Sequence, residues 1–442
     1  SLLAGQLAAP AGAQQEVIAF QHLGTADGLP ERNVYRILQD RLGFMWLGTS
    51  NGVVRHDGQA FTVYRPDPAD PHSLSGRLII SLHEDRAGEL WIGTYGGGLN
   101  RYDRERDRFI HYRHDSRDPR SLSFDMVGAI FEDSGGELWI GTGDVEVSGG
   151  DGGGLNRLDR ETGTFTRYQH DPADPGSLSH EAVSAIVEGH DGELWVATPG
   201  GGLNRLNRQT GTFVHLRHHP DDPTSLSDDH ITVLFTDRAG RIWAGTWSGG
   251  LNRLDPESGT FVRYRHDPAD PQSLGHDRIY ALHEDGAGTL WVGGLGGVLQ
   301  RYDPAADGFV HYRPDPLDPD SLSYNTGIWA IVEDRTGTLW VAARGAGLDK
   351  WNRFGARFAR FTHRPDDPGS LSSNHVKAIL EDRGGTLWVG TRDAGLNRID
   401  LRDGTATRFR HDPERPGSLR SDLVYAVHRG PSGSLWVGTR GG

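Results

Sequence analysis

Short segments in which apolar and polar residues alternate recur along the whole chain. Residues 278–285 read "RIYALHED" and predict a strand, because alternation with period two among Ile, Tyr and Leu is typical of half-buried strands. Three further segments follow in the same copy, namely "TLWVGG", "VLQRYD" and "FVHYRP", and glycine-containing turns separate them. Four short antiparallel strands joined by tight turns are therefore predicted for one copy.

A tryptophan occupies the same place in the second strand of every copy. Successive tryptophans are separated by 45 to 56 residues and most often by 48; they are Trp46, Trp91, Trp139, Trp195, Trp243, Trp291, Trp340, Trp388 and Trp436. Four strands repeated at this period are typical of a β-propeller blade, whereas a horseshoe solenoid has shorter repeats and a helical array has a 3.6-residue period. Because the tryptophan recurs, we expect it to pack in the core with its indole N–H hydrogen-bonded.

The number of copies predicts an all-β propeller with nine blades of four antiparallel strands. Nine first strands can be read, but a strand at 17–23 precedes any complete blade, and the segment 423–442 supplies only two strands. We expect these terminal strands to share one split blade, which would leave no exposed sheet edge and make 16–442 a single domain. A ring of seven or eight blades, with the surplus copies in a second ring, is the alternative.

The repeats resemble a known family. The pattern V-x-A-I-x-E-D-x-x-G-x-L-W-[IV]-G-T-x-G-G-G-L-N-R, followed by an aromatic or leucine and an acidic turn, closely resembles the two-component regulator propeller repeat. The segment "FQHLGTADGLPERNVYRILQDRLGFMWLGTSNGVVRHDG" resembles the opening blade of such proteins. The resemblance covers residues 16–442. It implies the extracytoplasmic sensor region of a hybrid two-component system, which continues into a linking domain, a membrane helix and a histidine kinase.

Composition narrows the function classes. The formal charge of −14 argues against general nucleic-acid binding, which requires a basic surface. The chain has no cysteine, which excludes disulfides, iron–sulfur clusters and thiolate zinc sites. No cofactor is expected, because no metal-spaced cluster or nucleophile–base pair stands apart from the repeat.

The first residues predict export. The segment 1–15, "SLLAGQLAAPAGAQQ", is small and apolar and ends in an Ala-x-Ala site at Ala11 to Ala13, which is typical of the end of a signal peptide. We therefore expect a periplasmic or extracellular protein, cleaved near Ala13. No later run reaches the roughly 20 apolar residues that a membrane helix needs.

The candidate ligand-binding residues lie where the copies differ. The long connectors, such as "YQHDPADPGSLS" at 168–179, should open on the same face as the residue after each Gly-Thr pair. On that face we expect an arc of cations and aromatic rings that suits carboxylate or sulfate groups on a sugar. The predicted residues are Arg344, Arg392, Arg440, Lys377, Trp329, Tyr280, Tyr425, Tyr95 and Trp247.

The predicted function is an extracytoplasmic sensor module that binds an oligosaccharide or another anionic ligand. A protein-interaction scaffold and a propeller-fold lyase or hydrolase are the alternatives, although the 21 histidines mostly recur in the same repeat context and so indicate structure. Paired aspartates in the "HDPxDP" connectors could hold calcium, but turn formation explains them better. The insertion that contains Asp144, Glu146 and Asp151 could form a calcium site or a lid, and a tolerated surface insertion is the simpler interpretation.

Overall fold

The computed structural model describes nearly all of the repeats. The described residues are 19–144, 152–318, 320–352, 363, 367–382, 386–400, 405–430 and 433–441. The predicted leader at 1–15 lies outside them, so its cleavage stays a prediction. The chain divides into two compact units, Ser1–Phe354 and Gly355–Gly442, and each is described by itself.

The first unit contains seven four-stranded antiparallel sheets, numbered here as blades 1 to 7. Blade 1 comprises β2 Val34–Gln39, β3 Met45–Thr49, β4 Gly52–His56 and β5 Phe61–Tyr64. Blade 2 comprises β6 Ile79–Glu84, β7 Leu90–Thr94, β8 Leu99–Asp103 and β9 Arg108–Tyr112. Blade 3 comprises β10 Val127–Glu132, β11 Leu138–Thr142, β12 Gly154–Asp159 and β13 Thr164–Tyr168. Blade 4 comprises β14 Ala185–Glu188, β15 Leu194–Thr198, β16 Gly202–Asn207 and β17 Thr212–Leu216. Blade 5 comprises β18 Ile231–Thr236, β19 Ile242–Thr246, β20 Leu251–Asp255 and β21 Thr260–Tyr264.

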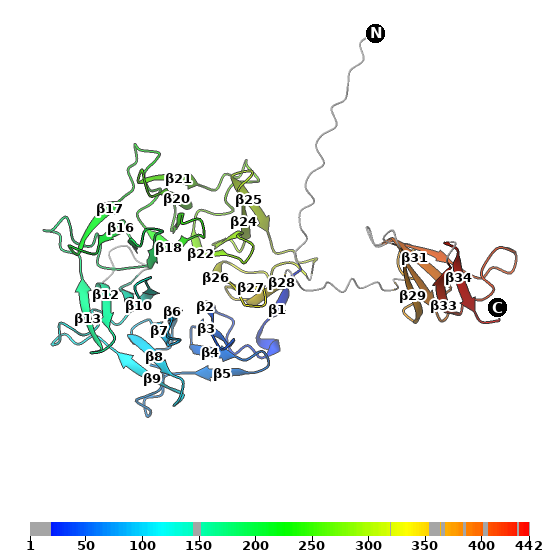
Figure 1. Cartoon of the computed structure of the whole chain (residues 1–442), viewed down its shortest axis with the longest axis horizontal. Helices are drawn as coiled ribbons and strands as arrows, with labels where there is room; N and C mark the ends of the chain where they lie inside the picture. The colour runs from blue at the N-terminus through cyan, green and yellow to red at the C-terminus, as the bar shows by residue number, and fades with distance from the viewer. Residues whose placement is uncertain are drawn as a thin grey trace, which may run out of the picture. The chain divides into compact units, whose positions relative to one another are not determined.

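The last two blades of this unit complete the ring (Figure 1). Blade 6 comprises β22 Ile279–Glu284, β23 Leu290–Gly294, β24 Leu299–Asp303 and β25 Gly308–Tyr312. Blade 7 comprises β26 Ile328–Glu333, β27 Thr338–Ala343, β28 Gly347–Asn352 and the first strand of the chain, β1 Gln21–Leu23. A short 3₁₀ helix, Thr25–Asp27, connects β1 to blade 1.

The second unit contains two sheets. One has four strands, β29 Val376–Asp382, β30 Thr386–Thr391, β31 Leu396–Asp400 and β32 Ala406–Phe409, and the other has two, β33 Val424–Arg429 and β34 Leu435–Thr439. The β29 strand contacts β33, as neighbouring inner strands do in the first unit. In this two-stranded sheet Trp436 is 67% exposed, whereas the motif tryptophans of blades 1 to 7 are buried.

The all-β propeller class and the four-stranded antiparallel blades are confirmed, and nine sheets are found among the described residues. The predicted closure is wrong. The first strand does not pair with 423–442; it pairs with β28 in the register Gln21 to Lys350, His22 to Asp349 and Leu23 to Leu348. The inner strand β26 contacts β2, so seven blades already close a ring within the first unit. The alternative of a seven-bladed ring with surplus copies elsewhere is the one the structure adopts.

The recurring tryptophans explain why the blades pack. Each lies between neighbouring sheets; for example, Trp46 packs with the blade 2 residues Ile79, Leu90 and Ile92. Its indole N–H donates to Asp40 Oδ2 at 2.8 Å, and the same bond recurs in five other blades, from Trp91, Trp139, Trp243, Trp291 and Trp340. The predicted core role of the tryptophans is confirmed in blades 1 to 7 and is wrong for Trp436, which is exposed. Burial of each indole is favourable because its one donor is satisfied.

Glycine is required where the second strand turns into the third. Gly98 has a φ of 81°, and a Cβ there would lie 2.4 Å from the carbonyl oxygen of Tyr112. The Gly98 amide donates to the carbonyl of Asp125, which belongs to the connector entering blade 3. The amide of Tyr95, the residue after the Gly-Thr pair, donates to the carbonyl of Leu78 just before β6. The turn after Gly-Thr and the long connectors therefore share one face of the ring, as predicted.

Candidate functional site

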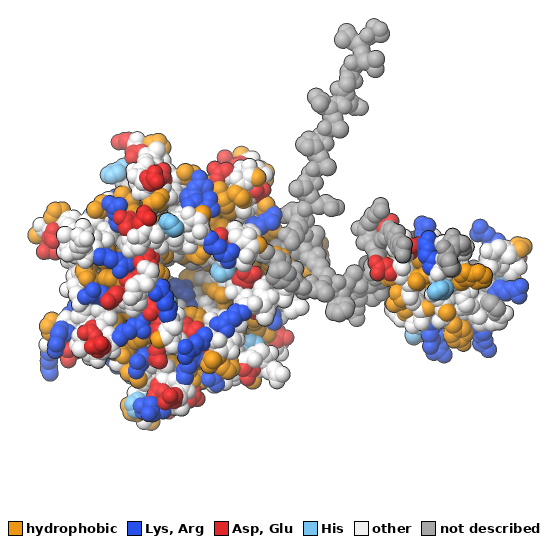
Figure 2. Space-filling model, in the orientation of Figure 1, with side chains coloured by type: hydrophobic (Ala, Val, Ile, Leu, Met, Phe, Trp, Pro, Cys, Tyr) orange, Lys and Arg blue, Asp and Glu red, His pale blue; other side chains and the backbone are white. Residues whose placement is uncertain are grey.

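A pocket of about 380 Å³ opens on the axis of the seven-bladed ring. Figure 2 shows the middle of the ring hollowed, with Lys and Arg surface in and around the hollow. Every blade contributes the second residue of its inner-strand segment to the lining; these are Tyr35, Ile80, Gly128, Ser184, Thr232, Tyr280 and Trp329. Tyr95, Trp247 and Arg344, which follow Gly-Thr or its equivalent, complete the rim together with Asp144. The pocket is thus built mainly from positions that vary between the copies.

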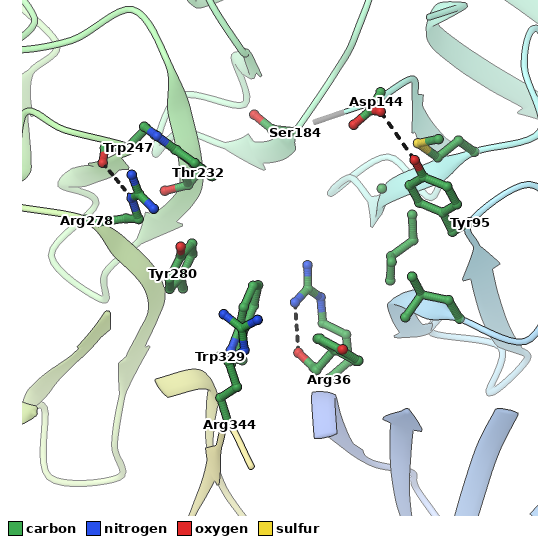
Figure 3. Close-up of a pocket in the computed structure, with 15 residues that line it drawn as sticks. Arg36, Tyr95, Asp144, Ser184, Thr232, Trp247, Arg278, Tyr280, Trp329 and Arg344 are labelled. Atoms are coloured by element: carbon green, nitrogen blue, oxygen red, sulfur yellow. Dashed lines mark hydrogen bonds between the residues drawn. The ribbon is translucent and has the colours of Figure 1, made fainter. Parts of the chain in front are cut away.

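Aromatic rings line one side of the pocket. Tyr280 and Trp329 stack with centroids 4.4 Å apart and planes 10° apart. Tyr35 meets Trp329 edge-on at 5.5 Å, and Trp247 meets Tyr280 edge-on at 6.4 Å. The four rings form a continuous wall across blades 5, 6, 7 and 1, which we call the aromatic arc (Figure 3). Such a wall offers flat apolar surface with positive ring edges.

The opposite side of the pocket is lined by smaller side chains. Ile80, Gly128, Ser184 and Thr232 occupy the positions that hold aromatic rings in blades 6, 7 and 1. The two hydroxyls are already used between blades: Ser184 donates to the carbonyl of Ile231 at 2.6 Å, and Thr232 donates to that of Ile279. These residues give the pocket its width and hold neighbouring blades together.

Two of the arginines on the rim lie against the aromatic arc. The Arg278 guanidinium lies 3.9 Å from the centroid of Trp247, and its Nε donates to the Trp247 carbonyl at 3.1 Å. The Arg344 guanidinium lies 5.7 Å from the centroid of Trp329. Both contacts hold a cation by the face of an indole, which orients the guanidinium without neutralising it.

A third arginine, Arg36, extends from β2 toward the middle of the pocket (Figure 3). One of its terminal nitrogens donates to the carbonyl of Tyr35 at 2.8 Å. Burial lowers the pKa of Arg36 to about 10, so the side chain stays charged at neutral pH. Among the described residues of the lining, Arg36, Arg278 and Arg344 are three cations and Asp144 is one carboxylate, so this part of the lining is net positive.

Asp144, the first carboxylate of the insertion, belongs to the site. The Tyr95 hydroxyl donates to Asp144 Oδ2 at 3.3 Å, which links the rims of blades 2 and 3. Glu146 and Asp151, the other carboxylates of the proposed calcium site or lid, lie outside the described residues. Within the described ranges, no group of three or more His, Asp or Glu side chains has the arrangement of a metal site.

The repeated aspartates and histidines of the connectors have structural roles. Asp67 Oδ1 accepts the amide of Ala69, and Asp70 Oδ1 accepts that of His72, both at 2.9 Å. In a later connector, His114 Nδ1 donates to the carbonyl of Leu122 at 2.9 Å, and the same bond recurs at His170, His218, His266, His363 and His411. The interpretation of these residues as turn formers is therefore confirmed.

The structure brings five of the predicted ligand-binding residues together. Tyr95, Trp247, Tyr280, Trp329 and Arg344 all line the axial pocket. The other four, Arg392, Arg440, Lys377 and Tyr425, belong to the second unit. The expectation that Arg344 and Arg392 stand in consecutive blades of one ring is wrong, because the inner strand of blade 7 contacts that of blade 1.

Two arginines of the pocket, Arg36 and Arg278, are not among the residues predicted from the sequence. Arg278 precedes the inner strand at a position that also varies, since the other ring copies read Asn33, Leu78, Met126, Ala182, His230 and Gly327. The rule that was applied to the other variable positions would have found it. Arg36 occupies a position at which the other ring copies have a small or aliphatic residue. This departure from the repeat is therefore the one sequence signal that could have indicated Arg36 as a functional residue.

Comparison with known proteins identifies the repeats. Seven segments match the family described as "Two component regulator propeller", namely 28–51, 73–96, 121–144, 177–200, 225–248, 273–296 and 370–393. Each contains the inner strand and the Trp-x-Gly-Thr strand that together carry the axial positions. The chain is thus a propeller protein built from two component regulator propeller repeats.

Solved structures and one curated protein extend this assignment. The extracellular domain of a hybrid two component system from B. thetaiotaomicron is 25% identical, with a TM-score of 0.66 over 96% of this chain and 52% of that structure. The extracellular domain of a one component system from the same organism shares the fold at 20% identity and a TM-score of 0.58, covering 96% of this chain and 51% of that one. A histidine kinase, P4 of Formosa agariphila, is 38% identical over 63 residues, which are 14% of this chain and 5% of the kinase.

The chain therefore spans about half of these structures and a small part of the kinase. The solved structures are extracellular domains. Among the residues that the structure describes, no helix is long and apolar enough to cross a membrane.

Proposed function

We propose that this chain is the exported, ligand-sensing propeller of a two-component signalling protein, and that it binds an anionic oligosaccharide in the axial pocket. The observation that carries the proposal is the pocket itself, in which three arginines lie beside a wall of aromatic rings. The similar structures, which are extracellular domains of signalling systems, support the role and the location.

The chemistry of the lining favours a ligand that is both ring-shaped and acidic. Aromatic rings bind the apolar faces of sugar rings, and arginine can donate two parallel hydrogen bonds to one carboxylate or sulfate. The pocket volume of about 380 Å³ lies at the lower end of the range for small-molecule sites, so we expect it to take one or two sugar units rather than a polymer segment. Ligand binding by the four predicted residues of the second unit stays a prediction; these are Arg392, Arg440, Lys377 and Tyr425.

The test is calorimetric titration of the whole chain with oligogalacturonate, a sulfated oligosaccharide and a neutral oligosaccharide of equal length. We expect the acidic probes to bind and the affinity to fall as salt rises, because the contacts are partly exposed. Replacing both rim arginines, in Arg278→Ala/Arg344→Ala, should weaken binding by roughly 10- to 1,000-fold. Chromatography of the mixture after incubation tests the enzyme alternative, since a lyase or hydrolase would shorten the probe. Equal or stronger binding of the neutral probe would contradict the proposal.

A further inference from the structure

Arg36 departs from the repeat at one position of the inner strand. The corresponding residues of the other six ring blades are Ser81, Ala129, Ala185, Val233, Ala281 and Ala330. These residues are small or aliphatic because the position faces the neighbouring blade; Ser81, for example, donates to the carbonyl of Val127 in blade 3. A long cation in this place in blade 1 is not required by the repeat, since six blades pack without it.

The charge of Arg36 is also not balanced by a carboxylate, unlike that of the arginines that join neighbouring blades through ion pairs. Arg104 lies 2.7 Å from Asp40, Arg160 lies 2.6 Å from Asp85, and Arg208 is similarly paired with Asp133. Within the described part of the chain, Arg36 makes no ion pair, and its one hydrogen bond goes to the carbonyl of its neighbour Tyr35. A guanidinium has five N–H donors, so most of its hydrogen-bonding capacity is left for another group.

Leaving a partly buried cation without an anion costs stability. Such a cost is typical of functional positions, where the missing partner is the ligand. Figure 3 shows the guanidinium directed toward the middle of the pocket, between Trp329 on one side and Tyr95 on the other. A group in the middle of the pocket would therefore have the Arg36 guanidinium facing it.

We propose that Arg36 determines specificity by receiving one acidic group of the ligand, a carboxylate or a sulfate, on the axis of the ring. The aromatic arc then contacts the apolar body of the ligand, and Arg278 and Arg344 lie at the rim. This inference rests on the proposed function but goes beyond it, because it assigns the choice between acidic and neutral ligands to one residue. Bidentate donation to a single carboxylate or sulfate suits the planar guanidinium and not an ammonium group.

A structural role for Arg36, as a support for the Tyr35 carbonyl, predicts a different result and needs no ligand to be tested. If the residue only supports the fold, Arg36→Ala should lower the melting temperature by several degrees. If it is held ready for a ligand, removing the uncompensated charge should leave the melting temperature of the ligand-free chain unchanged or higher. Arg313→Ala, at an exposed arginine outside the pocket, is the matched control.

The binding experiment compares oligogalacturonate with the same oligomer after reduction of its carboxyl groups, and with a sulfated oligomer. The parent chain should bind at least one acidic probe more tightly than the reduced one. In Arg36→Ala this preference should fall by roughly 10- to 100-fold while affinity for the reduced probe changes little. Arg36→Lys should retain only part of the preference for the acidic probe, because an ammonium group keeps the charge but lacks the two parallel N–H donors of the guanidinium. The carboxylated and sulfated probes distinguish the two sources of the acidic group.

The outcomes separate this inference from the proposed function. An Arg36→Ala chain that prefers the acidic probe as strongly as the parent overturns the role of Arg36 and leaves the pocket proposal standing. A ligand-free Arg36→Ala chain that melts several degrees below both the parent and Arg313→Ala also overturns it. A parent chain that binds neither acidic probe, or binds the reduced probe equally well, contradicts both.

Discussion

Tyr280 and Trp329, which come from the inner strands of blades 6 and 7, stack face to face with centroids 4.4 Å apart. The contact crosses a blade boundary, so the two rings are fixed relative to each other by the packing of the ring as a whole. The indole Nε1 of Trp329 is buried and has no hydrogen-bond partner within the described residues. A buried donor of this kind is costly unless a bound group accepts from it.

The first prediction concerns this pair. Trp329→Ala should weaken binding of an acidic oligosaccharide by about 10-fold or more, because it removes the flat surface and the donor together. Trp329→Phe removes the donor but keeps a smaller flat ring, so its loss should be smaller. Calorimetric titration measures both.

Tyr324→Ala is the control for these variants. Tyr324 is 82% exposed and is not among the residues that line the pocket. Its replacement should leave the affinity unchanged. Equal affinities for Trp329→Ala and the parent would show that the aromatic arc does not contact the ligand.

The second prediction tests how the ring closes. Gln21 and Lys350 lie opposite each other where β1 pairs with β28, and directly opposed residues in antiparallel strands are close enough for a disulfide. Because the chain has no cysteine, Gln21→Cys/Lys350→Cys should form one internal disulfide and raise the melting temperature under oxidising conditions. A non-reducing gel and peptide mapping detect the bond.

The matched control places the second cysteine at Val437 in β34, the strand expected to share a blade with the first strand. Gln21→Cys/Val437→Cys should remain reduced within one molecule. If the Gln21→Cys/Val437→Cys variant formed its disulfide efficiently and the Gln21→Cys/Lys350→Cys variant did not, the result would support the split nine-bladed ring.

The sequence could predict the blades but not the size of the ring. The glycine turn and the alternating inner strand recur along the chain, and the aspartate that accepts from the motif tryptophan recurs in six of the seven ring blades, so the repeat indicates the form of a blade. The interface between blades is also much the same in every copy, and nothing in the repeat marks where the last blade must meet the first. That choice depends on the pairing of three residues, Gln21–Leu23, with β28.

The candidate site was also predicted only in part from the sequence. Comparing copies at variable positions located the pocket, because the second residue of each inner strand faces the axis in all seven blades. The comparison also extended the arc to Arg392 and Arg440, since it treated neighbours in sequence as neighbours in the ring. Arg36 escaped because only one copy departs from an otherwise uniform position, and a search for variation gives weight to positions that differ throughout.

The third prediction concerns an ion pair between blades 1 and 2. Buried Asp40 accepts from Trp46 at 2.8 Å and from Arg104 of the next blade at 2.7 Å. Burial alone would raise the pKa of Asp40, but these hydrogen bonds outweigh it and hold the pKa below its usual value. The pair therefore stabilises the fold above the ordinary carboxylate pKa, and this stability is lost as pH falls through the lowered value.

Asp40→Ala should lower the free energy of unfolding by about 3 kcal/mol, because Arg104 and the Trp46 donor lose their partner. Asp40→Ala/Arg104→Met should cost less than the sum of the two single changes. The boundary between blades 4 and 5 supports this expectation, because both partners are absent there together. Gly189 stands in place of the aspartate, and Pro256 stands in place of the arginine. Urea unfolding measures the three variants, and strict additivity would show that the pair is not coupled. Asp221→Ala, at an exposed aspartate, is the control.

The last prediction concerns the response of the ring to acid. The backbone N–H of Glu333 in blade 7 donates to His283 Nε2 of blade 6 at 2.9 Å, so that nitrogen must be unprotonated. Burial lowers the pKa of His283 to about 4; Asp285 opposes this shift and Arg238 adds to it. In the unfolded chain the imidazole has its ordinary pKa near 6.5.

The unfolded state therefore takes up a proton at a higher pH than the folded state does. Stability that depends on neutral His283 is complete above about pH 6.5 and is lost progressively as the pH falls from there toward 4. The loss should reach about 1–3 kcal/mol, since each unit of pKa difference corresponds to ~1.4 kcal/mol. In His283→Gln the amide oxygen can accept the Glu333 N–H at any pH. The difference in unfolding free energy between the parent and this variant should thus shrink or reverse between pH 7.5 and 4.5, with His72→Gln, at an exposed histidine, as the background. A difference that stays constant over this range would show that His283 is not kept neutral in the folded ring.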